Sequence, residues 1–558
     1  MTESQYRSVP EDTTGMPSGV PYIIGNELAE RFSFYGMKAI LTVFMTKHLL
    51  DAAGQPDPMA DEQAKSVYHL FTAGAYFFPM IGAMISDVLW GKYKTILLIS
   101  LMYCLGHGSL ALMDLGPMTG SWNMRPFLYI GLILIAVGAG GIKPCVSAHV
   151  GDQFGPGNKD LLTQVFNWFY FSINLGAAAS TFLTPILLVK FGPWAAFGLP
   201  GILMAIATFL FWMGRHKFIH VPPSGWEQFK QETLSPEGLR AIRNLTPLFL
   251  VFVPLFWAIF DQTGSAWVLQ AESMNRNFVG MEWLESQVQV VNPVLILTLI
   301  PVFTYLVYPA MGFLFNPTPL RKVGIGFVLT AMAFGISGLI EQAIEDRQSE
   351  PTAALWQAVM DSDTAPETMA AVQSIAEIGG VTLDDAGESD VAAAWAQAKP
   401  TFKAPGKLRD AVRAARSLGW EQSQIRPFTD GMPNIGWQFL AYFVLTSAEI
   451  LVSIVCLEFA YTQSPPRMKS FIMGVYFLGV SLGNLYVSGL NIVMDVTRDD
   501  QGRTFLDGPL YYYAFSIAML VATIGFIVFA LRYKGETYIH GDVHPNVEAA
   551  AVADGTEG

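Results

Sequence analysis

The sequence contains few charged residues for its length. Asp, Glu, Lys and Arg make up 14% of its 558 residues, whereas hydrophobic residues make up 52%. An average soluble domain carries about 25% charged residues. A soluble enzyme of this size is therefore not expected, and the composition favours a chain that is largely embedded in lipid.

Cysteine is also scarce. The three cysteines, Cys104, Cys145 and Cys456, all fall in apolar segments and form no CxxC or other paired spacing. We expect neither a disulfide framework nor a zinc site. The G-x-S-x-G, HExxH and P-loop motifs of common enzyme classes are missing too. The sequence therefore predicts no enzymatic activity and no metal or organic cofactor.

Basic patches are absent as well. The net charge is −13, and much of the acidic excess lies in residues 341–430 and after Lys534. Nucleic acid is not an expected partner. Residues 1–20 are polar and lack the continuous apolar run of a cleavable signal peptide.

Long apolar runs dominate the rest of the chain. A helix of about 20 apolar residues crosses a hydrocarbon core of roughly 30 Å. Twelve segments meet this description: 22–50, 66–89, 93–114, 126–150, 163–190, 194–216, 246–272, 286–315, 319–343, 434–461, 466–493 and 509–533. The predicted fold class is therefore an all-α integral membrane protein with twelve transmembrane helices.

Two polar segments interrupt this series. Residues 217–245 form a connector after the sixth span, and residues 344–433 form a longer insert after the ninth. Within the insert, ETMAAVQSIAEI (367–378) and KLRDAVRAARSL (407–418) have the spacing of short amphipathic helices. Both are too charged to cross a bilayer.

Six spans, a connector and six more spans are typical of a two-lobed transporter that binds its substrate near the midplane. Basic residues in the short loops, such as GKYK after the second span, place both termini in the cytoplasm. The host membrane is expected to be a bacterial inner membrane or a plasma membrane. The expected segments are an N-terminal tail (1–21), a six-helix lobe (22–216), a cytoplasmic connector (217–245), a second lobe in two parts (246–343 and 434–533), an extracytoplasmic insert (344–433) and an acidic cytoplasmic tail (534–558).

The first span contains four charged residues, Glu27, Glu30, Arg31 and Lys38. Each costs roughly 2.5–3.5 kcal/mol at the centre of a membrane helix. At about 100° per residue they share one helix face, which must then line a polar cavity. The alternative is that these groups pair with one another only to fix the packing.

Four further spans contribute one charged or titratable residue each: His69, Lys143, Asp261 and Glu449. A membrane histidine has two interpretations, a hydrogen-bonded packing residue or a proton carrier. Lys143 either snorkels to the interface or needs a buried carboxylate, for which Glu27 and Glu30 are the candidates by type. The expected cavity lining also includes Tyr35, Tyr68, Tyr76, Trp257 and Asn292.

A cavity with both signs of charge suits a zwitterion. Arg31 and Lys143 are candidates for binding a carboxylate, and Glu449 for binding an amine. Carboxylates that exchange a proton for a salt-bridge partner would couple binding to a pH gradient, because protonation changes which arrangement of the lobes is preferred.

These residues lie in motifs that resemble the proton-dependent oligopeptide transporter (POT) family of the major facilitator superfamily. ELAERFSFY (27–35) is similar to the family signature ExxERFxYY, and GGIKPCVSAHVGDQF and FSINLGA resemble its fourth and fifth spans. FWAIFDQTGSAWVLQ, QVVNP and FVLTSAEILVS resemble spans seven, eight and ten. The resemblance covers residues 22 to about 345 and 434 to about 533. It implies two six-helix lobes, a monomer, and import of di- and tripeptides by alternating access.

The resemblance also implies a role for each motif residue. It assigns Arg31 and Lys143 to the carboxylate side of the peptide, Glu449 to its amino terminus, and Lys38 with Asp261 to the outer gate. The implied substrate-binding set is Arg31, Tyr35, Tyr68, Tyr76, Lys143, Asn174, Trp257, Asn292, Glu449 and Ser453. The implied proton-coupling set is Glu27, Glu30, His69, Lys143 and Asp261, with protons as the coupling ion.

The sequence departs from the family pattern at several points. Phe34 replaces a signature tyrosine, Lys38 stands where arginine is common, and Tyr476 stands where tryptophan is frequent. The insert lies where animal members carry a larger extracellular domain. Three alternatives stay open: a carrier of nitrate or a larger organic anion, a nutrient sensor that binds without transporting, and a membrane enzyme.

Overall fold

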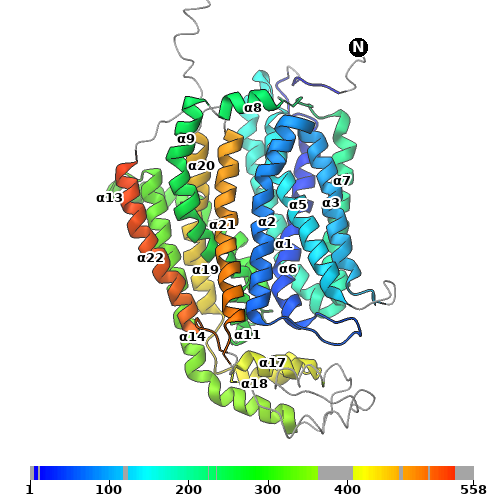
Figure 1. The fold of residues 1–558 in the computed structure, drawn as a ribbon, viewed down its shortest axis with the longest axis vertical. Coiled ribbons are helices and arrows are strands. Elements are labelled where there is room, and N and C mark those ends of the chain that lie inside the picture. The colour runs from blue at the N-terminus through cyan, green and yellow to red at the C-terminus, as the bar shows by residue number, and fades with distance from the viewer. Residues whose placement is uncertain are drawn as a thin grey trace, which may run out of the picture.

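The computed structural model describes residues 6–10, 13–116, 123–223, 225–233, 235–361, 372, 406–463, 469–499 and 503–533. The expected acidic tail (534–558) lies outside these residues, as does nearly all of the expected amphipathic helix at 367–378. Figure 1 shows two bundles of long helices side by side, with a smaller helical unit at one end.

The first bundle contains six long helices, one over each of the spans predicted between residues 22 and 216. Its helices are α1 (Val20–Lys47), α2 (Asp61–Met84) with a π-helical turn (Ile85–Trp90), α3 (Lys92–Leu112), α5 (Met124–Gly151), α6 (Leu162–Phe191) and α7 (Pro193–Met213). Short 3-10 turns at Pro156–Leu161 and Gly214–His216 flank α6 and α7. Pro144 does not break its helix, because α5 continues through it to Gly151.

A connector of two amphipathic helices, α8 (Trp226–Thr233) and α9 (Pro236–Pro247), leads into the second bundle. This bundle begins with a π turn (Leu248–Phe252), α10 (Val253–Phe260), a 3-10 turn η5 (Asp261–Gly264) and α11 (Ala266–Glu272). The two-residue strands β1 (Asn277–Phe278) and β2 (Met281–Glu282) then pair in an antiparallel hairpin. The remaining elements are η6 (Gln287–Val290), α12 (Val291–Val302), a π turn (Phe303–Val307), α13 (Tyr308–Leu314), α14 (Pro319–Asp361), α19 (Gly436–Glu449), a π turn η9 (Ile450–Ile454), α20 (Val455–Thr462), α21 (Lys469–Val496) and α22 (Pro509–Arg532).

The two ends of the molecule are distinct (Figure 1). The N-terminus, α8 and α9 mark one end, which we call the connector end. The helices α17 (Leu408–Ser417) and α18 (Gln422–Thr429) mark the other, which we call the insert end. Helix α17 confirms that KLRDAVRAARSL forms a short helix.

The ninth apolar span continues as a helix into the segment predicted to be the insert. A membrane span ending near residue 343 was predicted, but α14 continues as one 43-residue helix to Asp361. Its extension carries Leu355, Trp356 and Val359, which are buried in the same apolar core as Leu408 and Ala411 of α17. This packing stabilises the part of α14 that follows residue 343, where the apolar run of the sequence ends.

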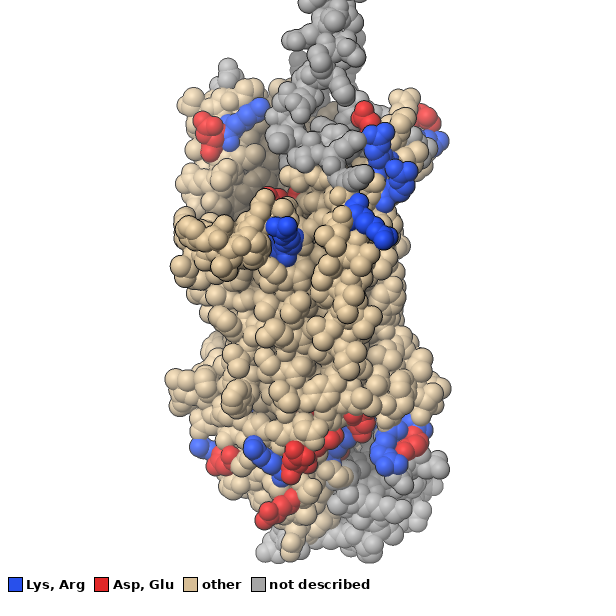
Figure 2. All heavy atoms as spheres, turned by 90° about the vertical axis from the view of Figure 1, so that its left-hand side faces the viewer, with Lys and Arg blue, Asp and Glu red and all other residues tan. Residues whose placement is uncertain are grey.

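Eleven of the described helices are long and apolar enough to cross a membrane. Helix α1 has 28 residues, but its five charged residues lower its hydropathy, so the count of twelve spans stays a prediction. Figure 2 shows charged side chains near the two ends of the face that carries α13 and α22, and a broad uncharged band between them. Such a band fits the hydrocarbon core of a bilayer.

Glycine allows two of the site-bearing helices to approach closely. A Cβ atom added to Gly82 of α2 would lie 2.1 Å from the carbonyl oxygen of Gly141 on α5. Small residues at such crossings are typical of membrane helix packing. The contact fixes the helix that carries His69 against the helix that carries Lys143.

Candidate functional site

Three charged residues of α1 form a buried cluster. The Nε atom of Arg31 donates to Oε1 of Glu27 at 2.6 Å and lies 3.1 Å from Oε2 of Glu30. All three side chains are buried. Spacings of three and four residues place these groups on one face of α1, as the sequence predicts.

Lys143 is not paired with either of those carboxylates. Its Nζ atom lies 4.0 Å from the ring centroid of Tyr76 on α2 and 5.8 Å from that of Phe34. Among the described residues no carboxylate lies within ion-pair distance of it, which differs from the expected contact with Glu27 or Glu30. Arg31 already engages both acids, and the aromatic faces attract the ammonium group instead.

Glu449 lies on the other lobe, at the last position of α19. Asn292 of α12 donates from Nδ2 to Oε2 of Glu449 at 2.7 Å and also bonds the Thr446 hydroxyl at 3.1 Å. The π turn η9 follows at once, and such turns are frequent at functional positions. One turn further on, the Ser453 hydroxyl lies 3.3 Å from the hydroxyl of Tyr476.

Aromatic residues occupy the boundary between the lobes. The rings of Tyr76 and Trp257 lie 6.2 Å apart, and Tyr76 also neighbours Phe477 at 6.1 Å. Tyr35 is half-buried and follows Arg31 by four residues, which places both on one face of α1. Asn174 of α6 is buried and donates to the carbonyl oxygen of Tyr170 in its own helix.

The lobes meet in a buried ion pair. Lys38 donates from Nζ to Oδ1 of Asp261 at 2.8 Å, and Thr42 donates to the carbonyl oxygen of Gly264 at 2.7 Å. The structure therefore brings together the two expected gate residues. Tyr68 lies beside this ion pair, because its ring lies 5.2 Å from Lys38 Nζ and its hydroxyl lies against Gly264.

His69 is fully buried and contacts the second lobe through both ring nitrogens. Its Nδ1 lies 2.7 Å from Oδ1 of Asn484, and its Nε2 lies 2.9 Å from the hydroxyl of Ser265. Asn484 in turn donates from Nδ2 to Oδ2 of Asp261 at 2.8 Å. Sequence reasoning missed Asn484 and Ser265. The signal was a single amide within the apolar run FLGVSLGNLYV of α21.

Further bonds between the lobes run from the middle of the bundle to the insert end. Ser481 donates to the carbonyl oxygen of Ala73 at 2.8 Å, and the hydroxyls of Ser66 and Ser488 lie 3.0 Å apart. A third such bond joins α1 to the second lobe, where Gln289 donates to the carbonyl oxygen of Ala39 at 2.9 Å. The structure is therefore closed at the insert end.

Comparison with known proteins identifies the family. A sequence model described as PTR2, the POT family, matches residues 93–234, 226–376 and 419–504. Peptide transporter family 1 of Drosophila melanogaster is 30% identical over 84% of this chain and 82% of its own length. Solute carrier family 15 member 2 of Homo sapiens is 36% identical, but the match covers 59% of this chain and 50% of the human protein.

Solved structures agree with this result. The crystal structure of an auto-inhibited POT family peptide transporter is 28% identical, covers 95% of this chain and 99% of its own, and superposes with a TM-score of 0.68. That of the POT family transporter PepTSo is 29% identical, with coverages of 93% and 99% and a TM-score of 0.67. The chain is a multi-pass membrane protein and belongs to the POT family of transporters.

Proposed function

We propose that this protein is a proton-coupled symporter that imports di- and tripeptides by alternating access. The observation that carries the proposal is the division of charge between the lobes. Arg31 and Lys143 lie on the first lobe, whereas Glu449 lies on the second. A zwitterion that bridges these groups draws the lobes together around itself, so binding and closure become linked.

The proposed carboxylate subsite consists of Arg31 and Lys143. Both acids next to Arg31 approach its Nε atom, which leaves its terminal amino groups for the two oxygens of a peptide carboxylate. Lys143 lies over Tyr76 without a carboxylate of its own among the described residues, so it supplies the second positive charge.

The proposed amine subsite is Glu449. Asn292 holds one of its oxygens and so orients the carboxylate. Tyr76, Trp257, Asn174 and Ser453 complete the proposed lining. These contacts engage the peptide termini and aromatic surfaces rather than one particular side chain, which favours di- and tripeptides of varied sequence.

The proposed proton path runs through His69. Asn484 uses its NH₂ group for Asp261 and for the carbonyl oxygen of Val480, so its Oδ1 accepts from His69 Nδ1–H. In neutral His69, Nε2 then accepts from the Ser265 hydroxyl. Protonation turns Nε2 into a donor and makes Ser265 reorient. It also adds a positive charge that competes with Lys38 for Asp261.

Glu27 and Glu30 are the second proposed pair of proton acceptors. Both are buried beside Arg31, so a substrate carboxylate that binds Arg31 displaces them. A displaced, buried carboxylate favours its protonated form. Substrate binding and proton uptake would then reinforce each other.

The proposal also covers the coupling ion, the host membrane, the topology and the oligomeric state. Protons are the coupling ion, and no other cofactor is needed. We place the protein in a cell membrane with both termini cytoplasmic and the insert outside. A monomer suffices, because one chain supplies both halves of the site.

The test is exchange of radiolabelled dialanine across proteoliposomes that contain unlabelled dialanine. We expect exchange by the wild-type protein and at least a tenfold loss in Glu449→Gln. Glu458→Gln is the matched control, because Glu458 lies nine residues further along the same span and is exposed. Binding without exchange would favour a sensor, and exchange of nitrate or an organic anion in place of dialanine would favour an anion carrier.

A further inference from the structure

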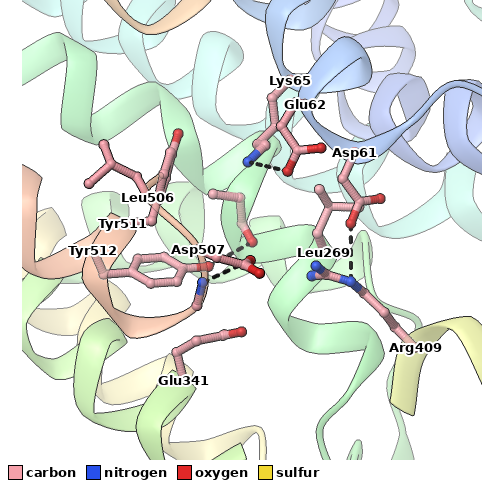
Figure 3. Close-up of a pocket in the computed structure, with 12 residues that line it drawn as sticks. Asp61, Glu62, Lys65, Leu269, Glu341, Arg409, Leu506, Asp507, Tyr511 and Tyr512 are labelled. Atoms are coloured by element: carbon pink, nitrogen blue, oxygen red, sulfur yellow. Dashed lines mark hydrogen bonds and ion pairs between the residues drawn. The ribbon is translucent and has the colours of Figure 1, made fainter. Parts of the chain in front are cut away.

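The insert helix α17 contacts both lobes at once. Arg413 donates from Nη2 to Oδ1 of Asp61 at 2.9 Å and from Nε to Oε2 of Glu272 at 2.9 Å. Asp61 begins α2 of the first lobe, and Glu272 ends α11 of the second. Arg409 adds a second contact to Asp61 at 3.0 Å (Figure 3). One arginine therefore bridges two acids that belong to different lobes.

The charges continue from Glu272 across the insert end. Lys47 of α1 lies 3.2 Å from Glu272 and 2.5 Å from Glu285, which also pairs with Arg276. Arg276 donates to Gln422 of α18 at 3.0 Å. Acidic and basic groups thus alternate through both lobes and the insert.

Apolar packing attaches α17 to the second lobe. Leu408, Ala411 and Ala415 are buried in the core that also contains Trp356 of α14. Lys407 adds an ion pair with Asp507, before α22, at 2.8 Å. Helix α17 therefore belongs to the second lobe, and its contacts with Asp61 must break, together with those of Lys47, when the lobes separate at this end.

We propose that α17 is a latch that holds the two lobes closed at the insert end through Asp61, Arg413 and Glu272. The inference rests on the proposed function in one respect, which is that the lobes separate there during transport. The family model matches residues up to 376 and again from 419, so α17 lies outside the matched segments. The insert of this chain thus supplies the arginine of the latch.

A cavity beside the latch makes it reversible. Asp61, Glu62, Lys65 and Arg409 line it, together with Asp507 and Tyr511 (Figure 3). Its volume of about 40 Å³ accommodates a few water molecules but no peptide. Water at this position can solvate the charges as they part, which lowers the cost of separating a buried ion pair.

The latch stays charged over the physiological pH range. Burial alone would lower the pKa of Arg413, but Asp61 and Glu272 raise it above its usual range. The same holds for Glu285 beside the latch: burial alone would raise its pKa, but Lys47 and Arg276 hold that pKa well below its usual range. The latch therefore sets how strongly this end closes and leaves proton sensing to other groups.

The experiment measures the distance between spin labels on the two lobes by double electron–electron resonance. The labels are attached to Ala52→Cys and Val279→Cys, both exposed at the insert end, after the three native cysteines are replaced by alanine. Measurements are made in the wild-type background and in Lys38→Gln, in which the gate ion pair is lost and the open state is easier to detect.

We expect Arg413→Gln to lower the closed-to-open ratio at least tenfold. Asp61→Asn should have the same effect, and the two changes together should add little to either alone. Arg416→Gln is the matched control, because Arg416 lies on the same helix but bonds Trp420 and Gln422 within the insert. Arg413→Lys keeps the positive charge and should give an intermediate closed-to-open ratio. It replaces Arg413→Gln in the comparison if that variant is not monodisperse.

Equal distance distributions for Arg413→Gln and Arg416→Gln in both backgrounds would overturn the latch. The measurement needs no substrate, so its result is independent of whether dialanine is exchanged. A failure of peptide transport would leave a positive result on the latch intact.

Discussion

Replacing Lys38 by Gln tests the gate most sharply. The Lys38–Asp261 pair has a separation of 2.8 Å, with side chains 10% and 5% exposed. In the closed state of Lys38→Gln, Asp261 keeps its bond from Asn484 but loses its counter-charge. The closed state is thereby weakened relative to one in which water reaches Asp261.

The size of the effect follows from the burial of the pair. Removing one partner of a buried ion pair costs about 3–5 kcal/mol. We take about 3 kcal/mol, because Asp261 keeps one hydrogen-bond donor, Asn484. At 1.4 kcal/mol per tenfold, the closed-to-open ratio falls roughly 100-fold. A protein that is about 99% closed would then be closed about half of the time.

The assay is the rate at which a water-soluble maleimide labels Ser66→Cys in a background without native cysteines. Ser66 is buried between the lobes beside Ser488 and becomes accessible only when the insert end opens. Labelling should be fast in Lys38→Gln and intermediate in Lys38→Gln/Asp261→Asn, which lacks the unpaired charge. An unchanged rate in Lys38→Gln, or a double variant that labels as fast as the single one, would show that the Lys38–Asp261 ion pair does not hold the gate closed.

Two further predictions concern the groups around this gate. Asn484→Leu removes the hydrogen bonds that link His69 to Asp261. Proton-driven accumulation of dialanine should therefore fall at least tenfold, while dialanine exchange without a gradient persists. Equal loss of accumulation and exchange would indicate that Asn484 has a structural role. Glu285 has a pKa held below its usual range, so its stabilising effect is present above its unfolded pKa and is lost only at still lower pH. The Tm difference between wild type and Glu285→Gln should therefore be the same at pH 7.5 and 5.5, and a smaller difference at pH 5.5 would contradict the assignment.

The charged face of α1 could be predicted because both arguments for it need only one short segment. The helical spacing places the charged residues on one face, and the cost of a charge in a membrane helix requires that this face meets a polar environment. The position of Lys143 over Tyr76 could not, since a sequence indicates that a buried lysine needs a partner but does not distinguish a carboxylate from an aromatic face. Asn484 was missed for a related reason, because one amide in an apolar span is also compatible with packing.

The latch could not be predicted from the sequence. Asp61 and Arg413 are 352 residues apart in the sequence. Each lies in a short polar segment, where a charged residue is ordinarily exposed to solvent. Their meeting depends on the extension of α14, which carries the apolar residues that seat α17. A linear pattern indicates that α17 is amphipathic but not which surface its basic face meets.

Proton-coupled peptide import is tested by uptake of labelled dialanine into proteoliposomes with an inward proton gradient. The proposed mechanism predicts accumulation that rises with the gradient, collapses with a protonophore, and is lost in Glu449→Gln and in Lys143→Ala but kept in Glu458→Gln. Uptake that is indifferent to the gradient, or that survives in both site variants, would contradict it.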